Sequence, residues 1–290
     1  MTSPIVSSSG EGLRLTSLPD LTLRGPAHRF AVVKEAWSAV ARTVALRTGL
    51  ELPEPTWVEA SDCAVYSRGL RLARIQLERD SVEGIAEAVI GRAFHLLSLG
   101  DTARLLEALC ARAPVYGREM ERLQVSPTFV HSVLRLLLRE RVSVVDLEAI
   151  LSALLEGWRP SWTAELALEK VREALREAIC QACSGERPEL AAITLPPRLE
   201  SGLRGKLAEP SLGLLFDLDG DTSATLLHGL NEVVLSLEGE GTVVLITAPG
   251  LRLPLFRLIE ANFPSLPVLS WNEVANDYEV VPVGLLDVKL

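Results

Sequence analysis

The stretch TVVLITAPGLRLPLFRLIEANFPSLPVLSW, Thr242 to Trp271, decides which fold class to expect for the last third of the chain. It contains a short apolar run, TVVLITA, then a segment with helical spacing around Leu255 to Asn262, and then a second apolar run, PVLSW. Short apolar runs separated by a helix are typical of parallel strands that are buried on both faces of a sheet. The stretch therefore predicts an α/β unit with a largely parallel sheet.

The same alternation continues on both sides of this stretch. Upstream, LGLLF at residues 212–216 is predicted to be a strand, and a helix is expected from Thr222. Downstream, EVVPVGLL at residues 279–286 is predicted to be the last strand. The segment SGERPELAAITLPP, residues 184–197, has the composition of a linker. We therefore expect a C-terminal α/β subdomain over residues 187–290.

The middle of the chain, residues 81–186, is predicted to be a helical subdomain. Its apolar residues recur with a period of 3.6 from Asp80 onward. Ser126 followed by Pro127 is a strong helix start, and Ser143 with Asp146 resembles a capping box. Further helices are expected from Ser81 to near Gly100, from Asp101 to just before Pro114, and from Ser161 to Gly185.

The first part of the chain is predicted to be a small α+β subdomain over residues 13–80, after a flexible tail at residues 1–12. A helix is expected from His28 to Arg47, with Gly49 as its C-terminal cap. The pieces TWVEA, CAVYS and LRLARIQLE resemble strands, and the last two flank a tight turn in a hairpin. The fold class expected for the whole chain is thus α+β and α/β, in several subdomains.

The composition narrows the possible functions. The chain has 290 residues and a net charge of −9, which argues against nucleic acid as a partner and against docking on an anionic membrane surface. No apolar run reaches the roughly 18 residues that a membrane span needs, and the first residues lack the features of a secretory signal. The four cysteines are too few and too unevenly spaced for a disulfide scaffold. The simplest expectation is a cytoplasmic protein.

One short motif, LLFDLDGDT at Leu214 to Thr222, suggests an enzyme. Haloacid-dehalogenase-type phosphohydrolases place a nucleophilic and an acid/base aspartate two residues apart after a buried strand, and Asp217 and Asp219 have this spacing. The chain has no lysine between Lys206 and Lys289 to hold a phosphoryl group. A magnesium-dependent phosphohydrolase is therefore an alternative, and the favoured interpretation is that the aspartates cap the next helix.

No other constellation predicts catalysis, a metal site or a cofactor. Cys180 and Cys183 are three residues apart near the end of a predicted helix, where two half-buried thiols are the better interpretation. The four histidines are scattered. The segment LRLLLRER, Leu134 to Arg141, has a leucine-rich face beside arginines. Those arginines are either a solvated face or a contact with an acidic neighbouring subunit, and both interpretations stay open.

Three longer stretches together resemble one known family. They are VALRTGLELPEPTWVEASDCAVYSRGLRLARIQL at residues 44–77, VLRLLLRERVSVVDLEAILSALLE at residues 133–156, and VLITAPGLRLPLFRLIEANFPSLPVLSWNEV at residues 244–274. The family is the major export-gate component of type III secretion systems (FlhA/SctV), and the resemblance is to its cytoplasmic domain.

The resemblance implies a non-enzymatic role without a cofactor. Such a domain forms a ring, typically of nine copies, beneath the membrane export apparatus at the cytoplasmic face of the inner membrane. It receives secretion substrates, their chaperones and the gatekeeper protein of a flagellar or virulence-type system. From charge and position, the residues that we expect to mediate self-association are Arg139, Arg141, Asp146 and Glu148.

Two departures from the family pattern lead to further expectations. We expect a domain without the family's membrane half, and therefore one that does not itself form the gate. LARIQLERD runs almost directly into the helix expected at Ser81, where the family has an Asp-Pro segment and a small second subdomain. We therefore expect a shortened domain with altered chaperone docking. A stand-alone regulator or adaptor derived from the export gate is the alternative to a ring platform.

Overall fold

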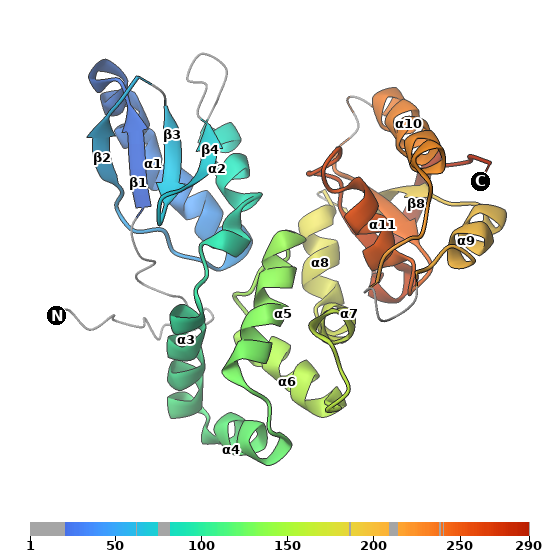
Figure 1. Cartoon of the computed structure of the whole chain (residues 1–290), viewed down its shortest axis with the longest axis horizontal. Coiled ribbons are helices and arrows are strands. Elements are labelled where there is room, and N and C mark those ends of the chain that lie inside the picture. The colour runs from blue at the N-terminus through green and yellow to red at the C-terminus, as the bar shows by residue number, and fades with distance from the viewer. Residues whose placement is uncertain are drawn as a thin grey trace. The chain divides into compact units, whose positions relative to one another are not determined.

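The computed structural model describes residues 21–61, 63–74, 82–185, 187–208, 214–237, 239 and 241–289 (Figure 1). The chain divides into two compact units, Met1–Val171 (unit 1) and Arg172–Leu290 (unit 2). A small mixed sheet, a series of helices and a parallel sheet confirm the predicted fold class. Within the described ranges, no helix is long and apolar enough to cross a membrane. The predicted tail lies outside these ranges, and the predicted subdomain boundaries stay predictions.

Unit 1 begins with a four-stranded sheet. Its elements are β1 (Leu21–Gly25), α1 (Ala27–Thr48), β2 (Thr56–Glu59), β3 (Ala64–Ser67) and β4 (Leu70–Arg74), with the strand order β2-β1-β3-β4. β1 and β2 are parallel and are joined through α1, whereas β3 is antiparallel to both β1 and β4. The predicted end of α1 at Gly49 and the hairpin turn at Arg68 and Gly69 are confirmed.

A helical segment follows the sheet in the same unit. It comprises α2 (Val82–Ile90), the short 3-10 helix η1 (Ala93–His95), α3 (Leu99–Arg112), α4 (Pro114–Leu123), α5 (Pro127–Arg139), α6 (Leu147–Gly157) and α7 (Ala164–Ala174), whose last residues belong to unit 2. The apolar faces of α5 and α6 are buried, as Leu137 and Ile150 illustrate. The predicted start of α5 is confirmed, because the Ser126 hydroxyl accepts a hydrogen bond from the Phe129 N–H at 3.1 Å.

The boundary between α2 and α3 differs from the prediction. The first of these helices ends at Ile90 instead of near Gly100, and α3 begins at Leu99 instead of Asp101. The cause is local: the Ser98 hydroxyl accepts from the Asp101 N–H at 3.1 Å, and the Asp101 carboxylate accepts from the Ser98 N–H at 2.9 Å. This reciprocal capping box sets the start of α3.

Two more helix predictions need correction. Asp146 is itself the cap of α6 and accepts from the Ala149 N–H at 2.9 Å, so no capping box with Ser143 forms. The helix expected from Ser161 to Gly185 is divided at Leu175 into α7 and α8 (Arg176–Cys183).

Unit 2 contains a parallel sheet with connecting helices. Its remaining elements are β5 (Glu189–Thr194), α9 (Pro197–Arg204), α10 (Gly220–Ser236), β6 (Val243–Thr247), α11 (Arg252–Ile259), β7 (Val268–Ser270), the 3-10 helix η3 (Trp271–Glu273) and β8 (Glu279–Leu285). The strand order is β7-β6-β5-β8, and every neighbouring pair is parallel. The predicted linker at residues 184–197 is therefore wrong, because it contains β5, which pairs on both edges.

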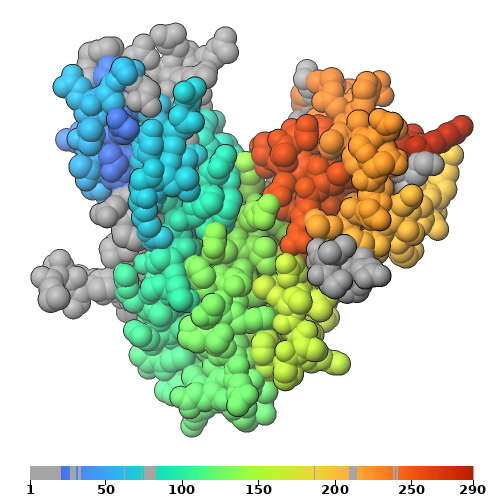
Figure 2. Space-filling model, in the orientation of Figure 1, coloured from blue at the N-terminus to red at the C-terminus, as the bar shows by residue number. Residues whose placement is uncertain are grey.

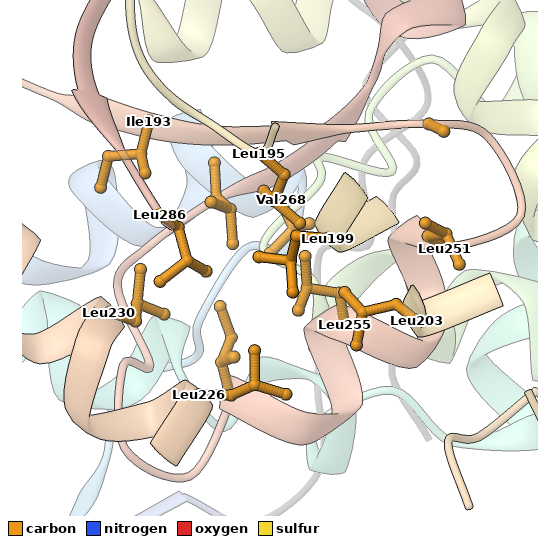
Figure 3. Close-up of a cluster of buried hydrophobic side chains, with 13 residues drawn as sticks. Ile193, Leu195, Leu199, Leu203, Leu226, Leu230, Leu251, Leu255, Val268 and Leu286 are labelled. Atoms are coloured by element: carbon orange, nitrogen blue, oxygen red, sulfur yellow. The ribbon is translucent and has the colours of Figure 1, made fainter. Parts of the chain in front are cut away.

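Figure 3 shows the apolar cluster that holds α9, α10 and α11 against this sheet. Side chains from the strands, from α9, α10 and α11, and from the last residues of the chain point into one shared space, among them Ile193, Leu203, Leu230 and Leu255. Gly284 in β8 permits close approach of α10, because a Cβ atom there would lie 2.7 Å from the Val233 Cγ1.

The strand predicted at residues 212–216 is wrong in its described part. Leu214 and Leu215 lie outside any strand, and Phe216 forms only an isolated antiparallel bridge with Leu207. Leu215 is exposed, so the apolar run is not a buried strand. Residues 209–213 lie outside the described ranges.

Candidate assembly site

Arg141, one of the four residues expected to mediate self-association, connects elements within its own subunit. Its backbone has φ of 60°, and its guanidinium Nη1 lies 2.6 Å from the Glu87 Oε2. Glu87 of α2 also pairs with Arg47 of α1. Burial lowers the pKa of Arg141, and the side chain is only 19 % exposed. The pair therefore holds the turn after α5 against α2.

Glu148 and Asp146 also have partners inside unit 1. The Glu148 Oε2 lies 2.7 Å from the Arg112 Nη2, which links α6 to the end of α3. The Tyr116 hydroxyl of α4 lies 2.9 Å from the Ser152 hydroxyl on the same side of α6. Asp146 caps α6, as described above. Glu148 thus contributes to the packing of α6 against α3 and α4, and Asp146 stabilises the start of α6.

Arg139 lies in a basic cluster on the exposed side of α5. Arg135 precedes it by one turn and donates from its Nε to the Phe94 carbonyl oxygen of η1 at 3.0 Å. Burial, followed by the charges of Arg135, Arg92 and Arg139, lowers the pKa of His95. The structure therefore gathers positive charge around η1 and α5, although the whole chain has a net charge of −9.

The four residues proposed from the sequence thus do not form one surface. Arg141 and Glu148 serve in ion pairs inside the subunit, Asp146 serves as a cap, and Arg139 belongs to the basic cluster. Their role in self-association stays a prediction.

A groove between α3, α4 and the start of α5 was missed by the sequence reasoning. It has a volume of about 560 Å³, and its floor is mostly apolar. Two glutamates, Glu107 and Glu121, line it together with Ala103, Leu106, Cys110, Gly117, Met120, Gln124, Val125, Ser126 and Pro127. Both glutamates are exposed, and within the described ranges neither side-chain carboxylate has a hydrogen-bond or ion-pair partner. The helices around this groove form the green part of the surface in Figure 2.

The aspartates of the phosphohydrolase motif have separate structural roles. Asp219 caps α10: its Oδ1 accepts from the Thr222 N–H at 2.7 Å, and this hydrogen bond lowers the pKa of Asp219. Asp217 is exposed and donates its backbone N–H to the Lys206 carbonyl oxygen. The capping interpretation is therefore confirmed for Asp219.

Thr247, the last residue of β6, is buried, and its hydroxyl is engaged by a neighbouring side chain. Its hydroxyl lies 3.1 Å from the Glu200 Oε1, and the same oxygen accepts from the Ala248 N–H at 2.7 Å. Over the part of the chain that the structure describes, no group of three or more His, Cys, Asp or Glu side chains could hold a metal ion. Cys180 and Cys183 are both buried free thiols.

Replacing Asp219 with alanine is expected to lower the melting temperature slightly, because α10 loses the acceptor for one of its first N–H groups. The matched variant Asp217→Ala is expected to have a smaller effect, because no side-chain cap is removed. Thermal melts followed by circular dichroism compare the two. Hydrolysis of a generic phosphate ester that is lost in Asp217→Asn would contradict this structural interpretation.

Comparisons with solved structures establish the fold. The fold is that of the cytoplasmic domains of type III export gates. The structure of the Chlamydia pneumoniae CdsV protein matches with a TM-score of 0.80 at 17 % identity, over 94 % of this chain and 99 % of that chain. Nonameric EPEC SctV-C matches with a TM-score of 0.76 at 18 % identity, over 93 % and 98 %. CdsV is also known in complex with CdsO, at a TM-score of 0.80 and 16 % identity, over 94 % and 99 %.

The sequence comparisons establish the family. The model of the FHIPEP family matches residues 55–279, which is more than half of the chain, and the chain belongs to this family. The flagellar biosynthesis protein FlhA of Bacillus subtilis (strain 168) is 29 % identical over 206 residues, which are 70 % of this chain. The match spans 30 % of the length of that relative. The predicted resemblance is confirmed. The altered segment expected before Ser81 falls on residues 75–81, outside the described ranges.

Proposed function

We propose that the chain acts as the cytoplasmic platform of a type III export gate. In this role it assembles with copies of itself into a ring, at the cytoplasmic face of the inner membrane, and receives export proteins without catalysing a reaction. Its partners are secretion substrates, chaperones or a gatekeeper, together with the membrane export apparatus. The observation that carries the proposal is the match in fold, over nearly the full length of both chains, to a nonameric cytosolic assembly.

Two features of the chain and one general rule support this proposal. The family consists of secretion-gate components. The helical segment presents both a basic cluster and an acidic apolar groove, which are different surfaces of one chain. Contacts between two different surfaces repeat from copy to copy and close into rings when the rotation permits.

The mass of the purified protein in solution tests the proposal. Light scattering over a range of concentrations is expected to show a species much larger than the monomer, whose fraction rises with concentration. A monomer at the highest soluble concentration would count against self-assembly of this chain alone and would favour the stand-alone adaptor.

The variant Arg139→Ala with Asp146→Asn tests the residues proposed from the sequence. Asparagine keeps the cap of α6, so the fold is retained while two charges are removed. We expect the concentration for half-assembly to rise by about tenfold, which is about 1.4 kcal/mol. Arg187→Ala with Asp277→Asn removes the same charges from exposed positions in unit 2 and serves as the matched control. Equal assembly of both variants would show that Arg139 and Asp146 do not contribute to the interface.

A further inference from the structure

The most exposed large apolar side chain among the described residues is Leu46, at 65 % exposure. It lies in the last turns of α1, one turn after Arg42, so both side chains project from the same face of the helix. Arg42 is exposed, and within the described ranges no hydrogen bond or ion pair engages its side chain. An exposed leucine beside an uncompensated arginine is a small basic and apolar knob.

The groove between α3 and α4 has the opposite character. Its floor offers apolar and sulfur-bearing side chains, including Met120 and Cys110, and its rim carries the negative charges of Glu107 and Glu121. A leucine would find apolar contacts in the floor, and an arginine beside it would find a carboxylate on the rim. Knob and groove are thus complementary both in polarity and in charge.

Both surfaces lie in unit 1, but on elements that are not in extensive contact with each other: α1 packs against α2, whereas α3 packs against α4 and α5. Complementary patches at different places on one chain form a head-to-tail contact, which is the kind that generates rings. The structure therefore points to a second copy of this chain as the occupant of the groove.

We propose that Leu46 of one copy inserts into the groove between α3 and α4 of the next copy, with Arg42 facing the rim glutamates Glu107 and Glu121. This inference rests on the proposed ring, for which it names the two contacting surfaces. Burial of Leu46 supplies the apolar contact, and the charge pairs set its orientation.

Cys110 in the floor of the groove permits a direct test. In a Cys63→Ser background, which removes the other half-buried thiol, Leu46→Cys places a second thiol on the knob. A short bis-maleimide cross-linker is then expected to produce covalent dimers and higher species on a denaturing gel, increasingly so at higher protein concentration. Burial raises the pKa of the Cys110 thiol, so its labelling at neutral pH is expected to be slow.

Two matched variants make this result specific. Leu46→Cys with Cys110→Ser is expected to give no cross-linked species. Leu70→Cys, which places a thiol on another exposed leucine in β4, is expected to give none with Cys110. Cross-linking equal to that of Leu46→Cys in either variant would overturn the contact.

The outcome separates this inference from the proposed ring. If light scattering shows large species but no cross-link forms between the thiol introduced by Leu46→Cys and Cys110, the proposed ring is supported and the proposed contact is overturned. The groove would then be available to another occupant. Absence of both large species and cross-link at the highest soluble concentration would overturn both. A cross-link whose yield rises with concentration supports the contact.

Charge reversal gives an independent readout of the same contact. Arg42→Glu alone is expected to raise the concentration for half-assembly by about tenfold, because one charge pair becomes a repulsion. Glu107→Lys with Glu121→Lys is expected to have a similar effect alone and to restore assembly when combined with Arg42→Glu. Simple addition of the two effects, without restoration, would show that these charges do not meet.

Discussion

Replacing Glu273 with alanine is expected to destabilise unit 2 by about 3–5 kcal/mol, the cost of leaving buried charges without their partner. Glu273 is 1 % exposed and pairs with Arg172 of α7, and the Arg252 Nε of α11 lies 3.9 Å from the same Oε1. Both arginines are buried as well. Removal of the carboxylate therefore leaves two buried guanidinium groups with less compensation.

The carboxylate also organises the backbone around it. The Glu273 Oε2 accepts from the Ser270 N–H at 2.7 Å, which caps η3, and the Arg172 Nη2 donates to the Val268 carbonyl oxygen at 3.2 Å. The Cys180 thiol of α8 lies 3.2 Å from the Glu273 carbonyl oxygen. The Glu273 carboxylate thus holds Arg172 and the start of η3 in place, and its loss is expected to loosen both, whereas the contact with Cys180 is made by the main-chain carbonyl and is kept in the variant.

Urea unfolding followed by circular dichroism measures this effect. The matched control is Glu279→Ala, which removes an exposed glutamate from β8 of the same unit and is expected to change stability by no more than about 0.5 kcal/mol. Equal stability of the two variants would show that the buried ion pairs contribute little.

The lowered pKa of Glu273 predicts that the stability of the protein falls at acid pH. Burial alone would raise the pKa of Glu273, but the charges of Arg172 and Arg252, with hydrogen bonds from Arg172 and Ser270, outweigh it and lower the pKa from its ordinary value of 4.5. A lowered pKa in the folded state contributes stability that is fully present above the unfolded pKa and lost as the pH falls through the folded pKa. Below about pH 4.5 the wild type is therefore expected to lose stability more steeply than Glu273→Gln does.

Much of the fold could be predicted from the hydrophobic pattern. The helices of the middle segment follow a helical period, because burial on a fixed face imposes it. β6 is instead recognisable as a short apolar run that is buried along most of its length. β5 was not predicted to be a strand, because Pro188 and Pro196 flank it and two alanines lie at its centre. This composition resembles that of a linker. Its strand structure depends on pairing with β6 and β8, which are distant in sequence. At residues 212–216 the opposite error was made, because LGLLF was predicted to be a strand. An apolar run that has no neighbouring strand to pair with need not be buried.

The candidate site was much harder to predict. Charges could be located in the sequence, but their partners could not: Glu87 is 54 residues from Arg141, and Arg112 is 36 residues from Glu148. In the sequence, the charged residues of both pairs are therefore indistinguishable from solvated surface charges. The groove has no sequence signature, since its residues are ordinary members of two amphipathic helices and of the turn that leads into α5. Leu46 is likewise one of many leucines, and only the tertiary structure shows that it is exposed.

Replacing Gly49 with alanine is expected to be the most damaging single-methyl change in unit 1. Gly49 ends α1 with φ of 78°, in the left-handed region, where an added Cβ costs about 1–2 kcal/mol. A Cβ atom there would also lie 2.6 Å from the Val145 backbone N, and a backbone atom cannot rotate away as a side chain can. Overpacking of this kind costs about 1–3 kcal/mol, so we expect a total of about 2–5 kcal/mol.

The position of Gly49 explains why this loss should reach beyond α1. The Val144 N–H donates to the Thr48 carbonyl oxygen at 3.0 Å, directly beside the contact of Gly49 with Val145. This is where the end of α1 meets the segment that leads into α6, so a shift there is expected to separate the sheet region of unit 1 from its helical segment. Increased proteolysis between α1 and β2, at residues 49–55, would report such a separation.

Gly69 provides the matched control in the same unit. Its φ is 77°, nearly that of Gly49, but a Cβ atom there would meet nothing within 4 Å. Gly69→Ala therefore isolates the cost of the left-handed backbone, about 1–2 kcal/mol, from that of the clash. The difference between the two variants in urea unfolding measures the close approach of α1 to Val145. Equal losses would mean that the segment before α6 can move aside freely, and that the end of α1 does not fix its place.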